Sequence, residues 1–421
     1  MERRFYDDKE AMPPQQREAY FNERMRKVVR HAYENAPAIK SKLDDAGVDP
    51  SEIRTIKDLE KIPITSKSEL HKLQRNSLPF GGFLGVPMDK LARIFVSPGP
   101  LYVPWSAEEI LESTAKAHYA FGIREGDRVV STFPYHFAAA WHGDYGLRKL
   151  GAMVIPIGPG SIDLQVQVMY ELGATVYMGS LSFFCSILKR AEEQGYNPRH
   201  DFKLRIVMAG GEMIIHSLKK KMEQDYGIRV FEGYSTGEAG ILGYNCIERQ
   251  GLHIPECVIL EIVDPKTGKQ LGPGEVGEVV VTTLCKEYPL IRLGTGDLSS
   301  YMDEPCGCGR TSHRLSGILG RTEDVIKVRG VFLYPHQVKE AVSSFPQISR
   351  SQLIISHSDN KDEITFKLEL GDQPVDKEKM AEELKNRFRD VCRLGVNRAE
   401  FVSRGTIPEG SKGIVDERVW E

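Results

Sequence analysis

Two stretches decide the expected fold of this chain: residues 204–213, LRIVMAGGEM, and residues 228–240, IRVFEGYSTGEAG. Each begins with a short β-rich run and ends in a turn that contains glycine. From ARIFVS at 92–97 onward, such runs alternate with helical stretches, which predicts a sheet covered by helices on both faces. Ligands of such folds bind at the carboxyl ends of the strands, so we expect these turns to form the site.

The sequence pattern changes after this region. Residues 257–284 alternate like long antiparallel strands with Gly-Pro-Gly turns and predict a β ribbon. The last hundred or so residues hold strand-like runs and a charged helix at 377–391, which is typical of a small α+β domain. The expected fold class is α/β, with a large N-terminal domain (1–319) of helix-covered sheets plus the ribbon and a small C-terminal domain (320–421).

The N-terminal region predicts helices. Residues 17–46 carry apolar side chains at helical spacing, with Met25 and Val28 on one side. The segment KIPITSKSEL at 61–70 predicts a loop in which Thr65 or Ser66 caps the next helix.

Composition excludes several classes of protein. A chain of 421 residues exceeds one ordinary core, so two or more domains are expected. The net charge of −3 gives no electrostatic case for nucleic acid or a membrane surface. No apolar run approaches the roughly 18–20 residues that span a bilayer, and the charged N-terminus lacks the apolar core of a signal peptide. Seven cysteines without a regular framework indicate a reducing cytoplasm.

The first two candidate site stretches are the strand ends quoted above. In MAGGEM, Gly210 and Gly211 let the backbone approach a flat ligand, although a tight strand–helix turn would use them equally well. In FEGYSTGEAG, Tyr234 offers a planar face and the Glu238 carboxylate suits a hard cation such as Mg²⁺. The alternative for the second stretch is a capped polar turn.

Two further stretches follow. In IRLGTGDLSS (291–300), Asp297 could accept both hydroxyls of a ribose, although an Asx-turn is the commoner use of Gly-Asp. In LGRTEDVIKVRG (319–330), Arg321 is a forked donor suited to ribose or phosphate. Glu323 lies where the large domain gives way to the small one.

The order AGGE, Y-S-T-G-E, T-G-D, G-R-x-E-D-x-x-K-x-R-G resembles the adenylate-forming superfamily. GLHIPE, CxCGRT and RGVFLYPHQVKEAV look most like its phenylacetate-CoA ligase family, over a resemblance that runs from about residue 90 to the C-terminus. The resemblance implies an ATP- and Mg²⁺-dependent ligase that activates an aromatic or small organic acid as an acyl-adenylate and transfers it to coenzyme A. It also implies a small domain that rotates between the two half-reactions, and a homodimer.

The resemblance assigns roles to single residues. Lys412 and Glu238 are the expected catalytic pair, Glu323 matches the hinge, and Tyr135, His136 and Phe137 match the segment that lines the acid pocket. The expected nucleotide-binding set is Ser97, Gly99, Gly210, Gly211, Glu212, Glu232, Gly233, Tyr234, Ser235, Thr236, Asp297 and Arg321.

The chain departs from the family pattern in three places. The phosphate loop, FVSPGPLYVPW at 95–105, has no lysine, and its three prolines remove backbone donors. Gly237 stands where the family has threonine, and Lys412 is offset by about two residues when counted back from Asp416. These departures leave two alternatives open: a nucleotide- or acyl-CoA-binding protein without ligase chemistry, and an adenylating enzyme with another acyl acceptor.

The cysteines predict a metal site. Cys306 and Cys308 form C-x-C, and Cys246 and His253 lie upstream, seven residues apart. Three thiolates and one imidazole make a closed tetrahedral zinc site of structural type, with Cys257 as the substitute ligand. The alternative is two unrelated β-hairpins with buried thiols. The remaining candidates are expected to pack in the core or lie at the surface: Cys185, Cys285, Cys392, His142 and His313.

Overall fold

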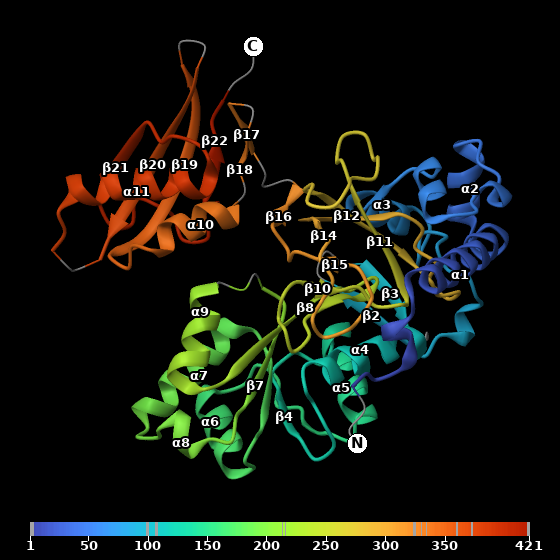
Figure 1. Cartoon of the computed structure of the whole chain (residues 1–421), viewed down its shortest axis with the longest axis horizontal. Helices are drawn as coiled ribbons and strands as arrows, with labels where there is room; N and C mark the ends of the chain where they lie inside the picture. Colours follow the sequence, from blue (N-terminus) through green and yellow to red (C-terminus); the bar gives the residue numbers. More distant parts are fainter. Residues whose placement is uncertain are drawn as a thin grey trace. The chain divides into compact units, whose positions relative to one another are not determined.

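The computed structural model describes residues 4–97, 101–105, 108–212, 214, 216–322, 326–329, 331–333, 335–358, 361–371 and 374–418. The chain divides into two compact units, Met1–Ile318 and Leu319–Glu421. Figure 1 shows the labelled elements of both units.

The N-terminal region forms two helices, α1 (Pro14–Asn35) and α2 (Pro37–Asp45), which agrees with the helical spacing over 17–46. The break falls at Ala36, which has extended backbone geometry (φ −111°, ψ 101°). Proline disfavours helical geometry in the residue before it and fits the first position of a new helix, so Pro37 ends one helix and starts the next. Met25 and Val28 are buried, as expected.

The main sheet of the large unit has a parallel half and an antiparallel half. The parallel half runs β5-β4-β6-β7-β8, and β8 then pairs antiparallel with β9, from which the order continues through β10 and β15 to β14. The strands are β4 (Arg128–Ser131), β5 (Met153–Ile155), β6 (Val176–Gly179), β7 (Ile206–Ala209), β8 (Arg229–Thr236), β9 (Gly240–Tyr244), β10 (Leu252–His253), β14 (Tyr301–Met302) and β15 (Arg314–Leu315).

Helices cover both faces of the parallel strands, which confirms the α/β prediction (Figure 1). Alternate residues of a strand point to opposite faces. Val207 therefore packs with residues of α6 (Ile162–Glu171) and α7 (Leu181–Glu193), while its neighbour Ile206 packs with α4 (Glu108–Ala120) and α5 (Ala138–Lys149). The other helical segments of this region are α8 (Pro198–Asp201), α9 (His216–Lys221) and the π-helical turn η5 (Met222–Tyr226).

The ARIFVS run is β2 (Arg93–Ser97), which does not extend the helix-covered sheet as expected. It forms a two-stranded antiparallel hairpin with β3 (Leu101–Trp105), as far as the described residues show. Only three residues separate the two strands, so they pair locally rather than through a crossover.

A second sheet of the large unit contains the predicted ribbon. β11 (Val258–Val263) and β12 (Gly277–Thr283) pair antiparallel, and β12 pairs with β13 (Leu293–Ser299), whose other edge pairs with the short parallel strand β1 (Thr65–Ser66). Helix α3 (Lys67–Asn76) follows β1, and Ser66 is its cap because its Oγ accepts a hydrogen bond from Glu69 N at 3.2 Å. The short 3₁₀ turns are η1 (Asp8–Ala11), η2 (Pro50–Glu52), η3 (Ile56–Lys61) and η4 (Met88–Lys90).

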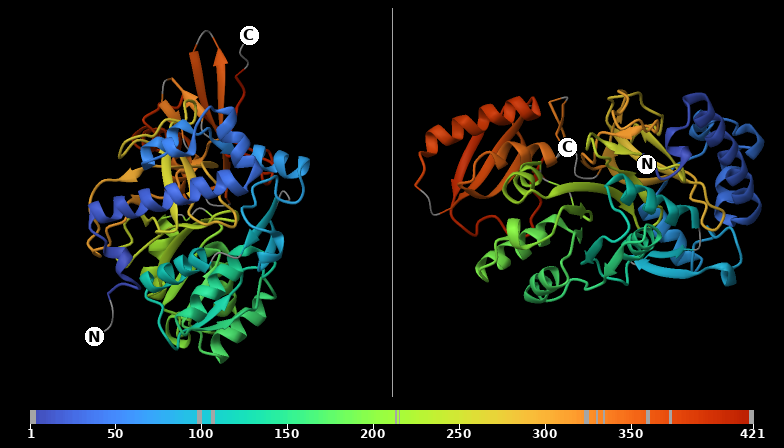
Figure 2. Two further views of the ribbon diagram at one scale, coloured as in Figure 1. Left: turned by 90° about the vertical axis from the view of Figure 1, so that its right-hand side faces the viewer. Right: turned by 60° about the horizontal axis from the view of Figure 1, so that its bottom comes forward.

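The small unit is α+β, as expected. Its sheet has the order β21-β20-β19-β22, with α10 (Pro335–Ser343) and α11 (Lys377–Cys392) on one face (Figure 2). Phe388 of α11 packs against Phe366 of the sheet. The strands of this sheet are β19 (Ile348–Ser358), β20 (Lys361–Leu370), β21 (Arg398–Val402) and β22 (Ile414–Asp416). Outside it, β16 (Gly320–Arg321) begins the unit, and β17 (Ile326–Val328) and β18 (Val331–Leu333) form a separate two-stranded sheet. Across the described parts of both units, no helix combines the length and apolarity that a bilayer crossing needs.

Candidate active site

The Gly-Gly turn after β7 lies against β8 and an aromatic ring. Gly211 has φ +81°, a geometry that favours glycine. A Cβ on Gly210 would lie 3.8 Å from both the Gly233 carbonyl oxygen and the Phe133 ring, and one on Gly211 would lie 3.7 Å from that ring. The turn therefore exposes backbone beside a flat apolar side chain.

Tyr234 and Asp297 come from different sheets and meet through a hydrogen bond. The Tyr234 hydroxyl donates to Asp297 Oδ2 at 2.9 Å, and each residue is 8% exposed. The backbone N–H of Asp297 donates to Thr295 Oγ1 at 3.1 Å. A buried hydroxyl donor fixes the orientation of the carboxylate, so two of the four predicted stretches form one polar centre.

Glu238 follows β8 and is buried, with an incompletely bonded carboxylate. Within the described residues, its Oε2 has no hydrogen-bond partner, and the nearest charge is Lys67 Nζ at 3.4 Å. Thr236 Oγ1 accepts a hydrogen bond from Ala239 N at 3.2 Å, which is the capped polar turn of the alternative reading, while Ser235 is exposed. The capped turn and the available carboxylate oxygen coexist.

Lys67 was missed from the sequence, where its segment was assigned to a loop. It is the first residue of α3. A cation at this position is disfavoured by the helix dipole, and this signal could have marked it as a candidate.

The phosphate-loop strand β2 ends near the turn that carries Gly237 and Glu238. Ser97 ends β2, and a Cβ on Gly237 would lie 3.8 Å from Ser97 Cβ. Ser97 Oγ is buried without a hydrogen-bond partner among the residues described. Gly99 lies outside the described residues, so its predicted contact with phosphate stays a prediction.

Glu212 and Glu232 both hold other protein groups. Glu212 accepts hydrogen bonds from the backbone N–H and the hydroxyl of Ser182, both at 2.7 Å, in the first turn of α7, where the helix dipole favours an anion. Glu232 pairs with Lys219 at 2.7 Å. Contact of either carboxylate with a ligand stays a prediction.

The residues expected to line the acid pocket precede α5. Tyr135 Oη lies 3.5 Å from Asp144 Oδ1, and burial raises the pKa of Tyr135 to about 12. Burial also raises the pKa of Asp144. His136 is exposed, and its ring lies 4.1 Å from the ring of Phe137.

His142 and His313 both lie against aromatic rings, which favours the packing role over the surface role that the sequence left open. The ring centroid of His142 lies 3.9 Å from that of Trp105, and burial lowers the pKa of His142 to about 3. His313 lies 5.9 Å from Tyr301, and burial lowers its pKa as well. His142 is therefore neutral near pH 7 and is a packing residue.

The four predicted metal ligands converge in a buried cluster. One donor atom from each of Cys246, His253, Cys306 and Cys308 lies within 4.8 Å of the others. The Cys246 and Cys306 sulfurs are 3.6 Å apart, and Cys308 Sγ is 3.4 Å from His253 Nε2. Hydrogen bonds from Cys246 and then from His253 lower the pKa of Cys308. His253 Nδ1 lies 3.0 Å from Ser312 Oγ, so Nε2 is the nitrogen that faces the thiols.

The N-terminal segment binds the protein around this cluster. Arg4 Nε donates to the Cys308 carbonyl oxygen at 3.0 Å. The Glu10 side chain, 0% exposed, accepts from Arg310 Nε at 2.5 Å and from Tyr6 N at 2.6 Å. Cys257 instead lies in the large hydrophobic core, and the cluster of four forms without it.

Of the predicted site residues of the small unit, two are described. Arg321 is exposed in β16. Lys412 precedes β22, and its carbonyl oxygen accepts a hydrogen bond from Gln352 Nε2 at 3.0 Å. Glu323 lies outside the described residues. The predicted roles of Arg321, Lys412 and Glu323 stay predictions.

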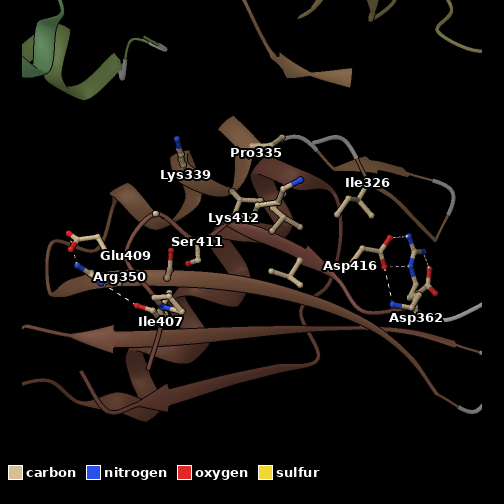
Figure 3. A pocket seen from close by; sticks show the side chains of 18 of the residues that line it. Ile326, Pro335, Lys339, Arg350, Asp362, Ile407, Glu409, Ser411, Lys412 and Asp416 are labelled. Atoms are coloured by element: carbon tan, nitrogen blue, oxygen red, sulfur yellow. Dashed lines mark hydrogen bonds and ion pairs between the residues drawn. The ribbon is translucent and has the colours of Figure 1, made fainter. Parts of the chain in front are cut away.

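Lys412 lines a cavity of about 1340 Å³ within the small unit (Figure 3). Two arginines that line this cavity form ion pairs with carboxylates. Arg350 pairs with Glu409 at 3.1 Å, and Arg418 pairs with Asp362 and Asp416. Figure 3 shows Lys339 and Lys412 extending away from the sheet on the same side.

Two family models match the chain. The model for AMP-binding enzymes matches residues 102–285, and the model for the C-terminal domain of AMP-binding enzymes matches residues 330–418. The two matches fall in the two units of the structure.

Curated relatives match most of the chain. The phenylacetate–coenzyme A ligase of Thermus thermophilus is 32% identical over 377 residues, which cover 86% of this chain and 83% of that protein. The phenylacetate–coenzyme A ligase of Escherichia coli K12 is 30% identical over 410 residues, 93% of this chain and 92% of that protein. A crystal structure of 2-hydroxyisobutyryl-CoA ligase in complex with 2-HIB-AMP aligns with a TM-score of 0.86 at 25% identity, covering 99% of this chain and 93% of that one.

Proposed function

The chain belongs to the phenylacetate–coenzyme A ligase family of AMP-binding enzymes and is an AMP-forming acid–CoA ligase that acts through an acyl-adenylate; we propose how its residues carry out this reaction. The supporting observation is the convergence of three strands in the large unit. The hydrogen bond from Tyr234 to Asp297 joins β8 to β13, and Ser97 of the phosphate-loop strand lies where a Cβ on Gly237 would be 3.8 Å from its Cβ.

In our proposal, Asp297 binds the ribose and Tyr234 holds the Asp297 carboxylate in place. A carboxylate that already accepts a buried hydrogen bond is oriented before the ligand arrives, which lowers the entropy lost on binding. The backbone of Gly210 and Gly211 and the ring of Phe133 supply a flat surface for the planar groups of the substrates.

Magnesium fits the buried carboxylate of Glu238. The Oε2 atom has no hydrogen-bond partner among the described residues, and carboxylate oxygens are the ligands that Mg²⁺ prefers in proteins. Bound there, Mg²⁺ would neutralise charge on the phosphate oxygens of ATP.

The reaction has two displacements. A carboxylate oxygen of the acid attacks the α-phosphorus of ATP, and pyrophosphate leaves with the electron pair of the broken P–O bond. The thiolate of coenzyme A then attacks the acyl carbon, and AMP leaves. We propose that the small unit rotates about Glu323 between these steps, that Arg321 assists at the ribose, and that Lys412 stabilises charge at the α-phosphate in the first step.

We propose an aromatic or small organic acid as substrate. Tyr135 and Phe137 are half-buried aromatic side chains in the segment that matches the family's acid pocket. They suit an aryl ring or a compact apolar acid, because apolar contact dominates small-molecule pockets.

The test is release of AMP and pyrophosphate from ATP with a panel of aryl and short acids, with and without coenzyme A. The expected result is coenzyme A-dependent AMP release with one class of acid. Release of AMP that depends on another acyl acceptor, or nucleotide binding without any turnover, would overturn the proposal.

Lys412 has a matched control in the same cavity. We expect Lys412→Ala to slow pyrophosphate release by about 100-fold or more, as removal of a charge-stabilising group does. Lys339→Ala should retain the wild-type rate, because Lys339 lies on α10 and we assign it no catalytic role. Equal rates for the two variants would remove Lys412 from the mechanism.

A second observation supports structural zinc in the Cys–His cluster. Tetrahedral zinc with Zn–S distances of about 2.3 Å places sulfur ligands roughly 3.8 Å apart. The Cys246 and Cys306 sulfurs, 3.6 Å apart, are close to this value. Metal analysis should give about one zinc per chain, and the variant Cys308→Ser should lose it; a zinc-free native protein would overturn this assignment.

Reduced thiols and the family resemblance suggest the enzyme's setting. All seven cysteines are free, and structural zinc requires reduced thiols, so we propose a cytoplasmic enzyme. The resemblance also leads us to propose a homodimer. Light scattering in solution tests the dimer, and a monomer would contradict it.

A further inference from the structure

The phosphate loop of this chain lacks the lysine of its family, and a lysine from another segment lies beside the site. Residues 95–105, FVSPGPLYVPW, contain no cation, and three prolines reduce the number of backbone donors. A triphosphate carries several negative charges, and a loop of this composition supplies little to neutralise them. An ATP-dependent reaction therefore needs a cation from elsewhere in the fold.

Resting on the proposed function, we propose that Lys67 is this cation and that its ammonium group binds the β- and γ-phosphates of ATP. Its Nζ lies 3.4 Å from Oε2 of Glu238, the residue expected to hold Mg²⁺. Within the described part of the chain, Glu238 makes no other ion pair. Because Mg²⁺ binds together with the triphosphate of ATP, a lysine next to the carboxylate that would hold Mg²⁺ is also next to the triphosphate.

Three restraints fix the position of Lys67. The preceding strand pairs in parallel with β13, Ser66 opposite Gly294, and β13 carries Asp297. The Ser66 hydroxyl caps α3 and so defines where the helix begins. Lys67 therefore follows directly on the strand that neighbours the ribose-binding strand.

The third restraint is a clamp between α3 and the phosphate-loop hairpin. Gln74, 2% exposed, donates from Nε2 to the carbonyl oxygen of Tyr102 at 2.8 Å and accepts from its backbone N–H at 2.9 Å. Two hydrogen bonds between one side-chain amide and one backbone residue hold the helix in register with β3. These two bonds tie the helix that begins at Lys67 to the hairpin, although 28 residues separate Gln74 from Tyr102.

Helix electrostatics favour an anion at this position. Lys67 is the first residue of α3, where the helix dipole disfavours a cation and favours an anion. A phosphate group would gain both from the dipole and from the ammonium group.

The Lys67 side chain can move from Glu238 to a phosphate. The 3.4 Å separation exceeds the roughly 2.7–2.9 Å of a charge-assisted hydrogen bond, and the side chain is 30% exposed. When the acid attacks the α-phosphorus, pyrophosphate leaves with the electron pair. Lys67 keeps its proton throughout and stabilises the growing charge of the leaving group by hydrogen bonding.

The test compares ATP with AMP. Lys67→Met should weaken ATP binding by about 10- to 100-fold, the range expected for a lost hydrogen bond to a charged group. AMP lacks the β- and γ-phosphates, so its affinity should stay within about twofold of the wild-type value. Lys67→Arg should recover part of the ATP affinity. Equal weakening of ATP and AMP, or no weakening of ATP, would overturn the proposal.

The matched control is Lys72→Met, an exposed lysine on the same helix, which should bind both nucleotides as the wild type does. Thermal melting checks that each variant is folded. Thioester formation from added acyl-adenylate and coenzyme A involves no β- or γ-phosphate, so Lys67→Met should keep that rate; its loss would indicate a merely structural lysine.

The outcomes separate this inference from the proposed function. Acid-dependent AMP release by the wild type, together with identical ATP affinity and KM for ATP in the Lys67→Met and Lys72→Met variants, would overturn only the role of Lys67. A wild type that releases no AMP with any acid would overturn the proposed function. In that case, the nucleotide-binding comparison would still decide whether Lys67 holds phosphate.

Discussion

The candidate nucleotide site and the Cys–His cluster lie in the same unit but differ in how their polar atoms are bonded. At the candidate nucleotide site, Ser97 Oγ and Glu238 Oε2 are buried without a hydrogen-bond partner in the described part of the chain. Around the cluster, Cys308 Sγ accepts from Arg310 N at 3.4 Å, and Arg310 binds the buried Glu10. An unpaired buried polar atom costs free energy, so it is retained where a ligand will bind. Changes at the first region should lower the reaction rate, and changes at the second should lower stability.

The largest effect should come from removal of the zinc proposed for the Cys–His cluster. Removal of zinc present at about 1,000 times its dissociation constant should lower the free energy of unfolding by about 4 kcal/mol. Urea denaturation with and without a chelator measures this. Cys185→Ser, outside the cluster, should keep the chelator effect, and Cys308→Ser should abolish it. Chelation without any shift of the urea midpoint would break the comparison.

Asp297→Asn should show the opposite behaviour. The neutral amide keeps the shape but weakens hydrogen bonds to the ribose by about 1.5–3 kcal/mol, which is roughly 10- to 150-fold in kcat/KM for ATP. The melting temperature of this variant should stay near that of the wild type, because the introduced amide oxygen can still accept the hydrogen bond from Tyr234. A stability loss as large as the activity loss would show that Asp297 is structural.

Two glycines beside Glu238 sharpen the comparison. Gly240 has φ +75°, and a Cβ there would meet Ile110 Cγ2 at 2.7 Å, so Gly240→Ala should cost about 1–3 kcal/mol of stability. Gly237→Ala should be nearly neutral, because its Cβ would meet Ser97 Cβ at an ordinary 3.8 Å. Thermal unfolding of the pair tests this, and equal losses would contradict it.

The smallest effect concerns pH. Burial lowers the pKa of His142 to about 3, below its unfolded value near 6.5, so between these values only the unfolded state binds the proton. The stabilising contribution is complete above pH 6.5 and is lost as the pH falls. When the pH falls from 7.5 to 5.5, the free energy of unfolding of the His142→Phe variant should therefore decrease by about 1.4 kcal/mol less than that of the wild type. Parallel pH profiles in urea denaturation would count against a buried neutral imidazole.

Much of the fold could be predicted because its signals are local. Strand runs, glycine turns and the Ser66 cap depend on neighbours in sequence, and they indicated the α/β sheet, the ribbon and the α+β unit. The errors were also local. The loop expected over 61–70 contains β1 and the start of α3, and ARIFVS pairs with its nearest neighbour rather than with the main sheet.

The candidate site was predictable only in part. Residue types in order marked Tyr234, Glu238 and Asp297, but no spacing could show that the hydroxyl of the first binds the carboxylate of the third, 63 residues away. The role of Glu212 at the start of α7 depends on the same kind of distant contact.

The sequence by itself determined the family, the order of the strands and helices, and the four residues of the Cys–His cluster, because these depend on residue type and local spacing. Only the tertiary structure decided which buried polar atoms lack a hydrogen-bond partner among the described residues, that Glu10 binds Arg310, and that Lys67 lies 3.4 Å from Glu238 across 171 positions of the chain. Such contacts depend on sheet register and helix packing, since these bring together side chains that no local pattern relates.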